Sequence, residues 1–185
     1  MVVIVISGQP GCGSTTTGKL LSEKLGINFF SVGHYFKSLD KGKETERSVK
    51  VWKSDAGKRL QFKKKGDLNY IEELQIALAK SGSIVIESKL GIKFLKDYAD
   101  LKVWLKAPIK VRAQRVAKRD RIPLEEAVKI LKEKEAIERR NFKKIYGFDF
   151  FQLEKEADIV IDTSSKTPRK IVAEIMACMR KNADI

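Results

Sequence analysis

A glycine-rich segment near the start of the chain has the residue types and spacing of a phosphate-binding loop. Two glycines stand five positions apart and a threonine follows two positions after the second, in the segment Gly8-Gln9-Pro10-Gly11-Cys12-Gly13-Ser14-Thr15-Thr16. Glycines let the backbone turn tightly, so that successive N–H groups point at the oxygens of a bound phosphate. The segment predicts a nucleotide site in which all nine residues contact the polyphosphate.

One position departs from the usual pattern, because Ser14 stands where a lysine normally contacts the β- and γ-phosphates. Backbone N–H groups and the helix dipole supply most of the attraction, so we expect weaker phosphate binding rather than none. The alternative is an ordinary turn between a strand and a helix. The flanking segments favour the phosphate loop, since an apolar run at 2–6 precedes it and a helical pattern at 14–25 follows it.

Two residues are candidates for holding Mg²⁺. Thr15 stands where a hydroxyl reaches the metal in such loops, and Glu87 follows an apolar run of strand length. Mg²⁺ prefers few protein oxygens and several waters, so Glu87, or Asp162 at another strand end, is expected to hold its water shell. The competing interpretation is that Glu87 pairs with a nearby lysine.

A second group that suits phosphate chemistry is basic. Arg112, Arg115 and Arg119 are spaced to share one face of a helix, and Arg139 and Arg140 lie in the next helical segment. Cations stabilise the charge that spreads over phosphoryl oxygens during transfer. Surface helices with Glu–Lys/Arg ion pairs would explain the same residues. The phosphate loop favours a hinged cover in which Arg115, Arg119, Arg139 and Arg140 are catalytic.

The chain offers little for acid–base catalysis by histidine. Its one histidine is His34, which excludes schemes that need two. We interpret His34 as a helix-start or surface residue. If the acceptor is itself an ionised phosphate, transfer to it requires no general base.

The order of elements predicts an α/β fold. Apolar runs of strand length lie at 2–6, 27–31, 83–87, 101–105 and 157–161, and helical patterns lie at 14–25, 67–80, 108–119, 123–145 and 167–181. Strands that are apolar throughout and alternate with helices indicate a parallel sheet covered on both faces. Ligands gather at the carboxyl ends of such strands. The polar segment 37–66 shows no clear element.

Composition indicates one soluble domain. The chain has 185 residues, average hydrophobic content, and no apolar run as long as a membrane span. The opening run does not read as a signal peptide, and Cys12 and Cys178 need no disulfide. We therefore expect a cytoplasmic protein without a membrane partner. No feature indicates an oligomeric state.

The net charge of +14 is the unusual number in this composition. It fits a Lys/Glu-rich surface, as in heat-adapted proteins, and it also fits binding of nucleotides or nucleic acid. No recognised nucleic-acid module is present, so nucleic acid is the weaker interpretation but is not excluded.

The order of landmarks resembles the nucleoside monophosphate kinases, and most closely the cytidylate kinases of archaeal type. The resemblance covers nearly the whole chain and is weakest at 37–66. The matching segments are the loop Ser7 to Thr17, Phe30-Ser31-Val32-Gly33 with Phe36, Ile84 to Ser88, Ala99 to Pro108 with Val111-Arg112-Ala113, Ile145-Tyr146-Gly147-Phe148-Asp149, and Ala157 to Ser164.

This resemblance implies a five-stranded parallel sheet sandwiched by helices, the P-loop NTPase fold, in a single domain. It implies a core of 1–30, 81–119 and 150–185, a monophosphate-binding region at 31–80 and a lid at 120–149. It further implies Mg²⁺-dependent transfer of the γ-phosphoryl group of ATP to CMP or dCMP. The acceptor would be bound by Ser31, Gly33, Lys37 and Lys89.

Some residues depart from that family. Lys37, Lys89 and Lys134 stand where many members have arginine, which keeps the charge but loses the bidentate fork for phosphate. Asn141 replaces a basic residue of the lid. Two alternatives therefore stay open: the same fold acting on AMP or another small phosphorylatable molecule, and a nucleotide- or RNA-binding protein with weak transferase activity.

Overall fold

In the computed structural model, which describes the backbone of residues 1–38 and 65–183, five parallel strands form one sheet in the order β2-β3-β1-β4-β5. The strands are β1 (Val3–Gly8), β2 (Asn28–Ser31), β3 (Ile84–Glu87), β4 (Leu101–Lys106) and β5 (Ile159–Asp162). Each matches an apolar run of the sequence to within two residues at either end. The predicted α/β fold with a five-stranded parallel sheet is confirmed.

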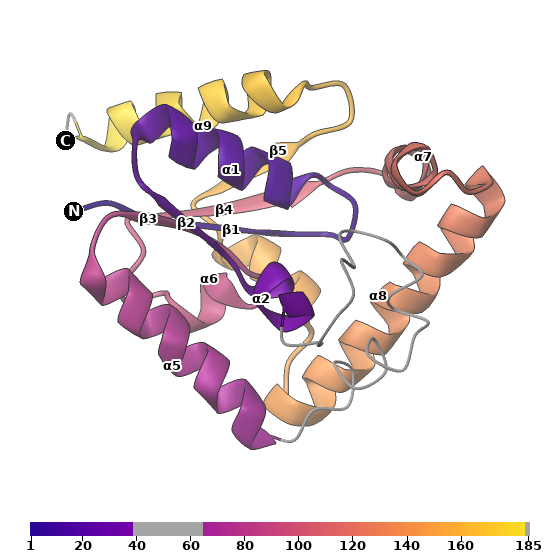
Figure 1. Cartoon of the computed structure of the whole chain (residues 1–185), viewed down its shortest axis with the longest axis horizontal. Coiled ribbons are helices and arrows are strands. Elements are labelled where there is room, and N and C mark those ends of the chain that lie inside the picture. Colours follow the sequence, from indigo (N-terminus) through magenta and orange to yellow (C-terminus); the bar gives the residue numbers. More distant parts are fainter. Residues whose placement is uncertain (39–64, 184–185) are drawn as a thin grey trace.

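Helices cover both faces of the sheet (Figure 1). Helices α1 (Ser14–Leu25) and α9 (Pro168–Ala183) lie on one face, and α5 (Lys65–Ser81), α6 (Gly91–Phe94) and the 3-10 helix η1 (Phe150–Glu156) lie on the other. Strand β1 shows why the runs are apolar throughout: Ile4 and Ile6 pack toward α1 and α9, whereas Val3 and Val5 pack toward the opposite layer. Since both sides of the strand are buried, neither has a polar position from Val3 to Ile6.

Two further helices stand across the carboxyl ends of the strands (Figure 1). They are α7 (Ile109–Asp120) and the long α8 (Leu124–Tyr146), each with a proline at its N-cap. The pair has a small core of its own, made of Ala113, Val116, Ala127, Ile130 and Leu131. The far end of α8 returns to the main body, where Phe142 and Tyr146 pack on the layer that contains η1.

Three short elements were not predicted, namely α2 (Val32–Ser38), α6 and η1. Each is too short to show a helical period in the sequence. The segment 37–66, for which the sequence indicated no clear element, falls largely outside the described residues. Among the helices that the structure describes, none is both long enough and apolar enough to cross a bilayer.

The close approach of the phosphate loop to β4 gives a test of this packing. A Cβ atom on Gly8 would lie 2.3 Å from the carbonyl oxygen of Leu105 and 2.9 Å from Cys12 Sγ. We expect Gly8→Ala to lower the free energy of unfolding by about 1–3 kcal/mol or more, as forced overpacking does. Gly33→Ala is the control, because the nearest atom would be 3.8 Å away. Urea unfolding measures the effect. Equal urea midpoints for Gly8→Ala and Gly33→Ala would contradict the close packing of Gly8 against β4.

Candidate active site

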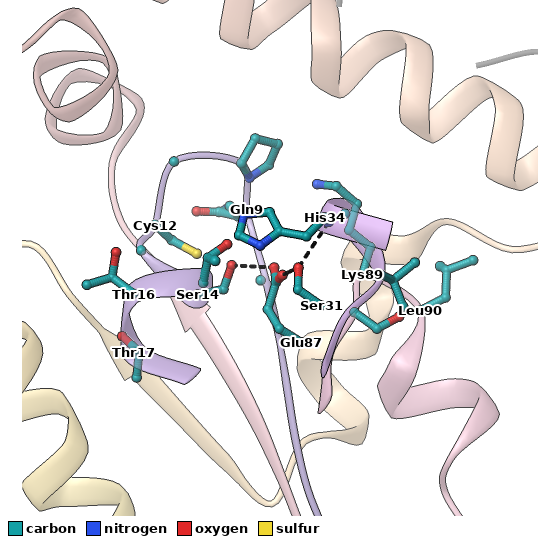
Figure 2. Close-up of a pocket in the computed structure, with 18 of the residues that line it drawn as sticks. Gln9, Cys12, Ser14, Thr16, Thr17, Ser31, His34, Glu87, Lys89 and Leu90 are labelled. Atoms are coloured by element: carbon teal, nitrogen blue, oxygen red, sulfur yellow. Dashed lines mark hydrogen bonds between the residues drawn. The ribbon is translucent and has the colours of Figure 1, made fainter. Parts of the chain in front are cut away.

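A pocket of about 860 Å³ lies at the carboxyl ends of β1, β2 and β3. The loop after β1, the start of α2 and residues 87–90 at the end of β3 surround it (Figure 2), and it extends to the facing sides of α5 and α8. Its size is in the upper part of the range for small-molecule sites. This is the position at which parallel α/β sheets bind ligands.

The predicted phosphate loop forms one wall of this pocket, and every residue from Gly8 to Thr16 lines it. Gly11 and Gly13 adopt φ angles of 82° and 97°, a left-handed conformation that favours glycine. Gly13 is the N-cap of α1 and no side chain caps the helix, nor does its first turn contain an acidic residue. The positive end of the α1 dipole is thus available to an anion.

Two arginines of α7 hold this loop from behind. Arg112 is buried and donates to the carbonyls of Ala107 at 2.8 Å and Pro10 at 2.9 Å, and it pairs with Glu135 of α8. For Arg112 the interpretation by Glu–Arg ion pairs fits, because a carboxylate neutralises its charge and backbone carbonyls accept its other hydrogen bonds. Its charge positions the loop.

Arg115 has a similar setting but also lines the pocket. Its guanidinium donates to the carbonyl of Cys12 at 3.3 Å and to both the hydroxyl and the carbonyl of Thr163. Cys12 itself is buried, and burial raises the pKa of its thiol. The thiol therefore stays protonated at neutral pH, and Cys12 serves as a packing residue of the loop.

The other three predicted arginines separate into two groups. Arg119 lines the pocket, where its guanidinium makes two 2.8 Å hydrogen bonds with the Asp120 carboxylate. Arg139 and Arg140 do not line it, and Arg139 instead pairs with Asp149. Successive residues of a helix point about 100° apart. The side of α8 that faces the pocket carries Lys134, Glu138, Asn141, Phe142 and Ile145.

Glu87 lies at the centre of the site (Figure 2). Its two oxygens accept hydrogen bonds from Ser14 Oγ at 2.8 Å and Ser31 Oγ at 2.6 Å. Among the described residues, these two hydroxyls rather than a lysine orient the carboxylate. Ser14 is thus matched to Glu87, which gives the departure from lysine a structural role. Asp162 lies outside the pocket lining and accepts hydrogen bonds from Ser164, which hold its pKa below the ordinary value.

Of the four residues predicted to bind the acceptor, three line the pocket. Ser31, Gly33 and Lys89 line the pocket. Lys37 lies in α2, but its side chain is outside the described residues. His34 lies near the start of α2, as interpreted from the sequence, and its backbone N–H donates to Ser31 Oγ at 3.2 Å.

The comparisons with known proteins agree with this geometry. The profile of the cytidylate kinase-like family matches residues 3–165. The chain belongs to this family. The resemblance inferred from the loop and the strand-end motifs is thereby confirmed.

Relatives that carry the name cytidylate kinase match over almost their full length. The protein from Ignicoccus hospitalis is 37% identical over 95% of this chain and 97% of its own. The one from Sulfurisphaera tokodaii is 38% identical over 92% and 91%. Among solved structures, a shikimate kinase from Acinetobacter baumannii aligns with a TM-score of 0.63 over 98% of this chain and 94% of its own, at 19% identity, which shows a shared fold.

A partly buried ion pair crosses the pocket of this family member. Lys89 Nζ lies 2.9 Å from Glu138 Oε2 and 5.2 Å from the centre of the Phe150 ring. The Glu138 side chain is only 4% exposed, against 25% for Lys89. The pair ties α8 to the segment after β3. Sequence reasoning missed Glu138, because a glutamate in a highly charged helix normally faces solvent.

Polar groups on α5 were missed as well. Glu72 and Gln75 line the pocket, opposite Tyr146 of α8. Burial, and then a hydrogen bond with the Glu72 carboxylate, raises the pKa of the Tyr146 hydroxyl, so this phenol stays neutral. A signal was present in the sequence, since Gln75 falls between Ile71 and Ala79 at the helical spacing of a buried face.

The unequal burial of Lys89 and Glu138 predicts unequal costs of breaking their pair. Lys89→Met leaves a buried carboxylate without its cation, and we expect it to cost about 3–5 kcal/mol of stability. Glu138→Gln leaves a lysine that can turn toward water, so its cost should be clearly smaller. The double variant Lys89→Met/Glu138→Leu should recover much of the loss.

Urea unfolding of the three variants checks this expectation. A Lys89→Met variant that is no less stable than Glu138→Gln would show that the pair does not account for the burial of the carboxylate.

Proposed function

We propose that this protein transfers the γ-phosphoryl group of ATP to CMP or dCMP, giving CDP or dCDP. The observation that carries the proposal is a single continuous pocket that joins the phosphate loop to the ends of β2 and β3 and to the faces of α5 and α8. Such a pocket can hold a donor triphosphate and an acceptor monophosphate with their phosphates adjacent. The name cytidylate kinase, carried by relatives that match along the chain, supports this choice.

The donor triphosphate would lie on the loop from Gly8 to Thr16. Backbone N–H groups and the dipole of α1 attract it, and cations around the pocket replace the absent loop lysine. The lysines and arginines that line the pocket are Lys19, Lys89, Arg115, Arg119, Lys134 and Lys166. Of the residues first considered catalytic, we propose Arg115 and Arg119, because Arg139 and Arg140 do not line the pocket.

The residues present fit Mg²⁺. Thr15 brings a hydroxyl to the pocket, and Ser14 and Ser31 orient the Glu87 carboxylate there. Among the described residues no group of three or more His, Cys, Asp or Glu could hold a metal, and a Mg²⁺ ion that keeps its waters and phosphate ligands needs no such group. When bound, Mg²⁺ neutralises charge on the β- and γ-phosphates.

The acceptor phosphate would lie near Ser31, Gly33 and Lys89, with Lys37 as a further candidate. A phosphate acceptor is already ionised at neutral pH, so no side chain has to remove a proton from it. This chemistry agrees with a pocket in which the one histidine of the chain, His34, lies in α2 and donates its backbone N–H to Ser31 Oγ (Figure 2).

We further propose that the chain is divided into the three functional regions that the family implies. The core is formed by 1–30, 81–119 and 150–185, the acceptor region by 31–80 and the lid by 120–149. Two unpaired cysteines, Cys12 and Cys178, support a cytoplasmic location.

A coupled assay with ATP, Mg²⁺ and each common monophosphate tests the function directly. CMP and dCMP should be phosphorylated in preference to AMP. A protein that binds ATP, phosphorylates no monophosphate and binds short RNA with a steep salt dependence would instead be an RNA-binding protein.

Thr15→Ala separates catalysis from ATP binding. Turnover with CMP should fall at least about tenfold, because the hydroxyl no longer helps to place Mg²⁺. A tenfold fall corresponds to a rise of about 1.4 kcal/mol in the activation free energy. ATP affinity in calorimetry should change little, since the backbone N–H groups remain. Thr15→Ser is the matched control and should keep most of the activity. Equal turnover in the alanine and serine variants would remove Thr15 from the metal site.

Arg119→Ala tests the cation contributed by α7. If the guanidinium leaves Asp120 for the transferring phosphoryl group, its loss should lower turnover by about 10²–10⁵-fold, by analogy with arginine fingers. Lys118→Ala is the control, because Lys118 is exposed on the same helix and does not line the pocket. Full turnover in both variants would show that Arg119 remains a partner of Asp120 throughout the reaction.

A further inference from the structure

The part of the pocket away from the phosphate loop has a distinct chemistry. It lies between α5 and α8 and is lined by Ile71, Glu72, Gln75, Phe94, Phe142 and Tyr146. The Phe94 and Tyr146 rings have their centres 5.2 Å apart, and those of Phe142 and Tyr146 are 6.3 Å apart. An apolar, aromatic wall with few polar groups suits a flat heterocycle better than a phosphate.

Gln75 supplies the first polar group of this wall. The residue is 2% exposed, and its Nε2 donates to the Ile71 carbonyl at 3.0 Å. This bond fixes the orientation of the amide, because a reversed amide would place two oxygens against each other. Within the part of the chain that the structure describes, the Gln75 Oε1 atom is buried and has no hydrogen-bond partner.

Glu72, one turn earlier on α5, repeats this arrangement. Its carboxylate is hydrogen-bonded with the Tyr146 hydroxyl. Its Oε1 atom is buried and, among described residues, accepts no hydrogen bond. Residues three apart lie on the same side of a helix, so both unused oxygens come from one side of α5.

Two unused acceptors in one wall carry an energetic cost. A buried acceptor without a donor costs about 1–3 kcal/mol. A ligand that brings N–H groups to this wall removes the cost, whereas a ligand that brings an oxygen adds repulsion to it. The wall is therefore selective for donors.

We propose that Gln75 and Glu72 select cytosine over uracil by accepting hydrogen bonds from the 4-amino group of the base. Cytosine carries two N–H donors on N4, whereas the 4-position of a 4-oxo pyrimidine is an acceptor. The two bases are otherwise nearly equal in size, so hydrogen bonding rather than shape decides between them. The inference rests on the proposed function, and it names the residues that make the acceptor site selective for cytosine.

The sharpest test is Glu72→Gln. The new side-chain oxygen can keep the hydrogen bond of Tyr146, which places the amide NH₂ where the unused carboxylate oxygen was. A donor then replaces an acceptor. We expect the wild type to prefer CMP over UMP by at least about 10²-fold in kcat/KM. In the variant this ratio should fall at least about tenfold, with activity on UMP rising and the change residing mainly in KM.

Gln75→Met provides an independent substitution, because it keeps the length of the side chain and removes the acceptor. Activity on CMP should fall about tenfold or more, as for one lost hydrogen bond in a buried site, while activity on UMP stays the same or rises. Glu73→Gln is the matched control. Glu73 is exposed on the same helix and does not line the pocket, so the CMP-to-UMP ratio should not change.

The outcomes separate the inference from the function on which it rests. If the wild type phosphorylates CMP and the ratio is the same in Glu72→Gln, Gln75→Met and the control, the inference is overturned and the kinase function stands. A wild type that uses UMP as well as CMP also overturns it. If the wild type phosphorylates no monophosphate, the proposed function itself fails. Thermal unfolding of each variant and calorimetric titration with CMP and UMP establish that a changed ratio reflects recognition of the base.

Discussion

The site depends on how the carbonyl groups of the phosphate loop are satisfied. A loop that turns its N–H groups toward a ligand must turn carbonyls away from it, and buried carbonyls need donors. Arg112 serves the carbonyl of Pro10, and Arg115 with Thr163 serves that of Cys12. The loop is also held against β4, since the Gln9 N–H donates to the Leu105 carbonyl at 3.2 Å. Its shape is thus set from behind, before any nucleotide arrives.

The same interactions connect α8 to the core. Glu135 pairs with the arginine beneath the loop, and Glu138, one turn later, pairs with Lys89 at the end of β3. Through these two ion pairs, α8 contacts the residues that support the phosphate loop and also the segment that follows β3. In the proposed function an acceptor phosphate would compete with Glu138 for the Lys89 cation, which would link the placement of α8 to the occupancy of the acceptor site.

Much of the architecture could be predicted from the sequence, for identifiable reasons. The strands are apolar on both sides because helices cover both faces, as Ile4 and Val5 of β1 illustrate. The loop is recognisable because glycine is required at Gly11 and Gly13 by their φ angles. Residue type alone does not say which side of a charged helix is buried. For this reason Arg139 and Arg140 were expected at the site, and Glu138 was overlooked.

The strand order also determines when the protein can fold. Strand β1 precedes the other four strands along the chain, yet it lies at the centre of the sheet, where Val3 pairs with Ile84 and Ile4 with Leu101. The apolar side of the sheet that holds Ile4 and Ile6 is completed only by Ile171, Val172 and Ile175 of the last helix. Contacts so distant in sequence slow folding and leave apolar surface exposed meanwhile. Until α9 has been synthesised, a ribosome-bound chain thus carries a partly uncovered sheet, because residues more than 160 positions after β1 complete the core around it.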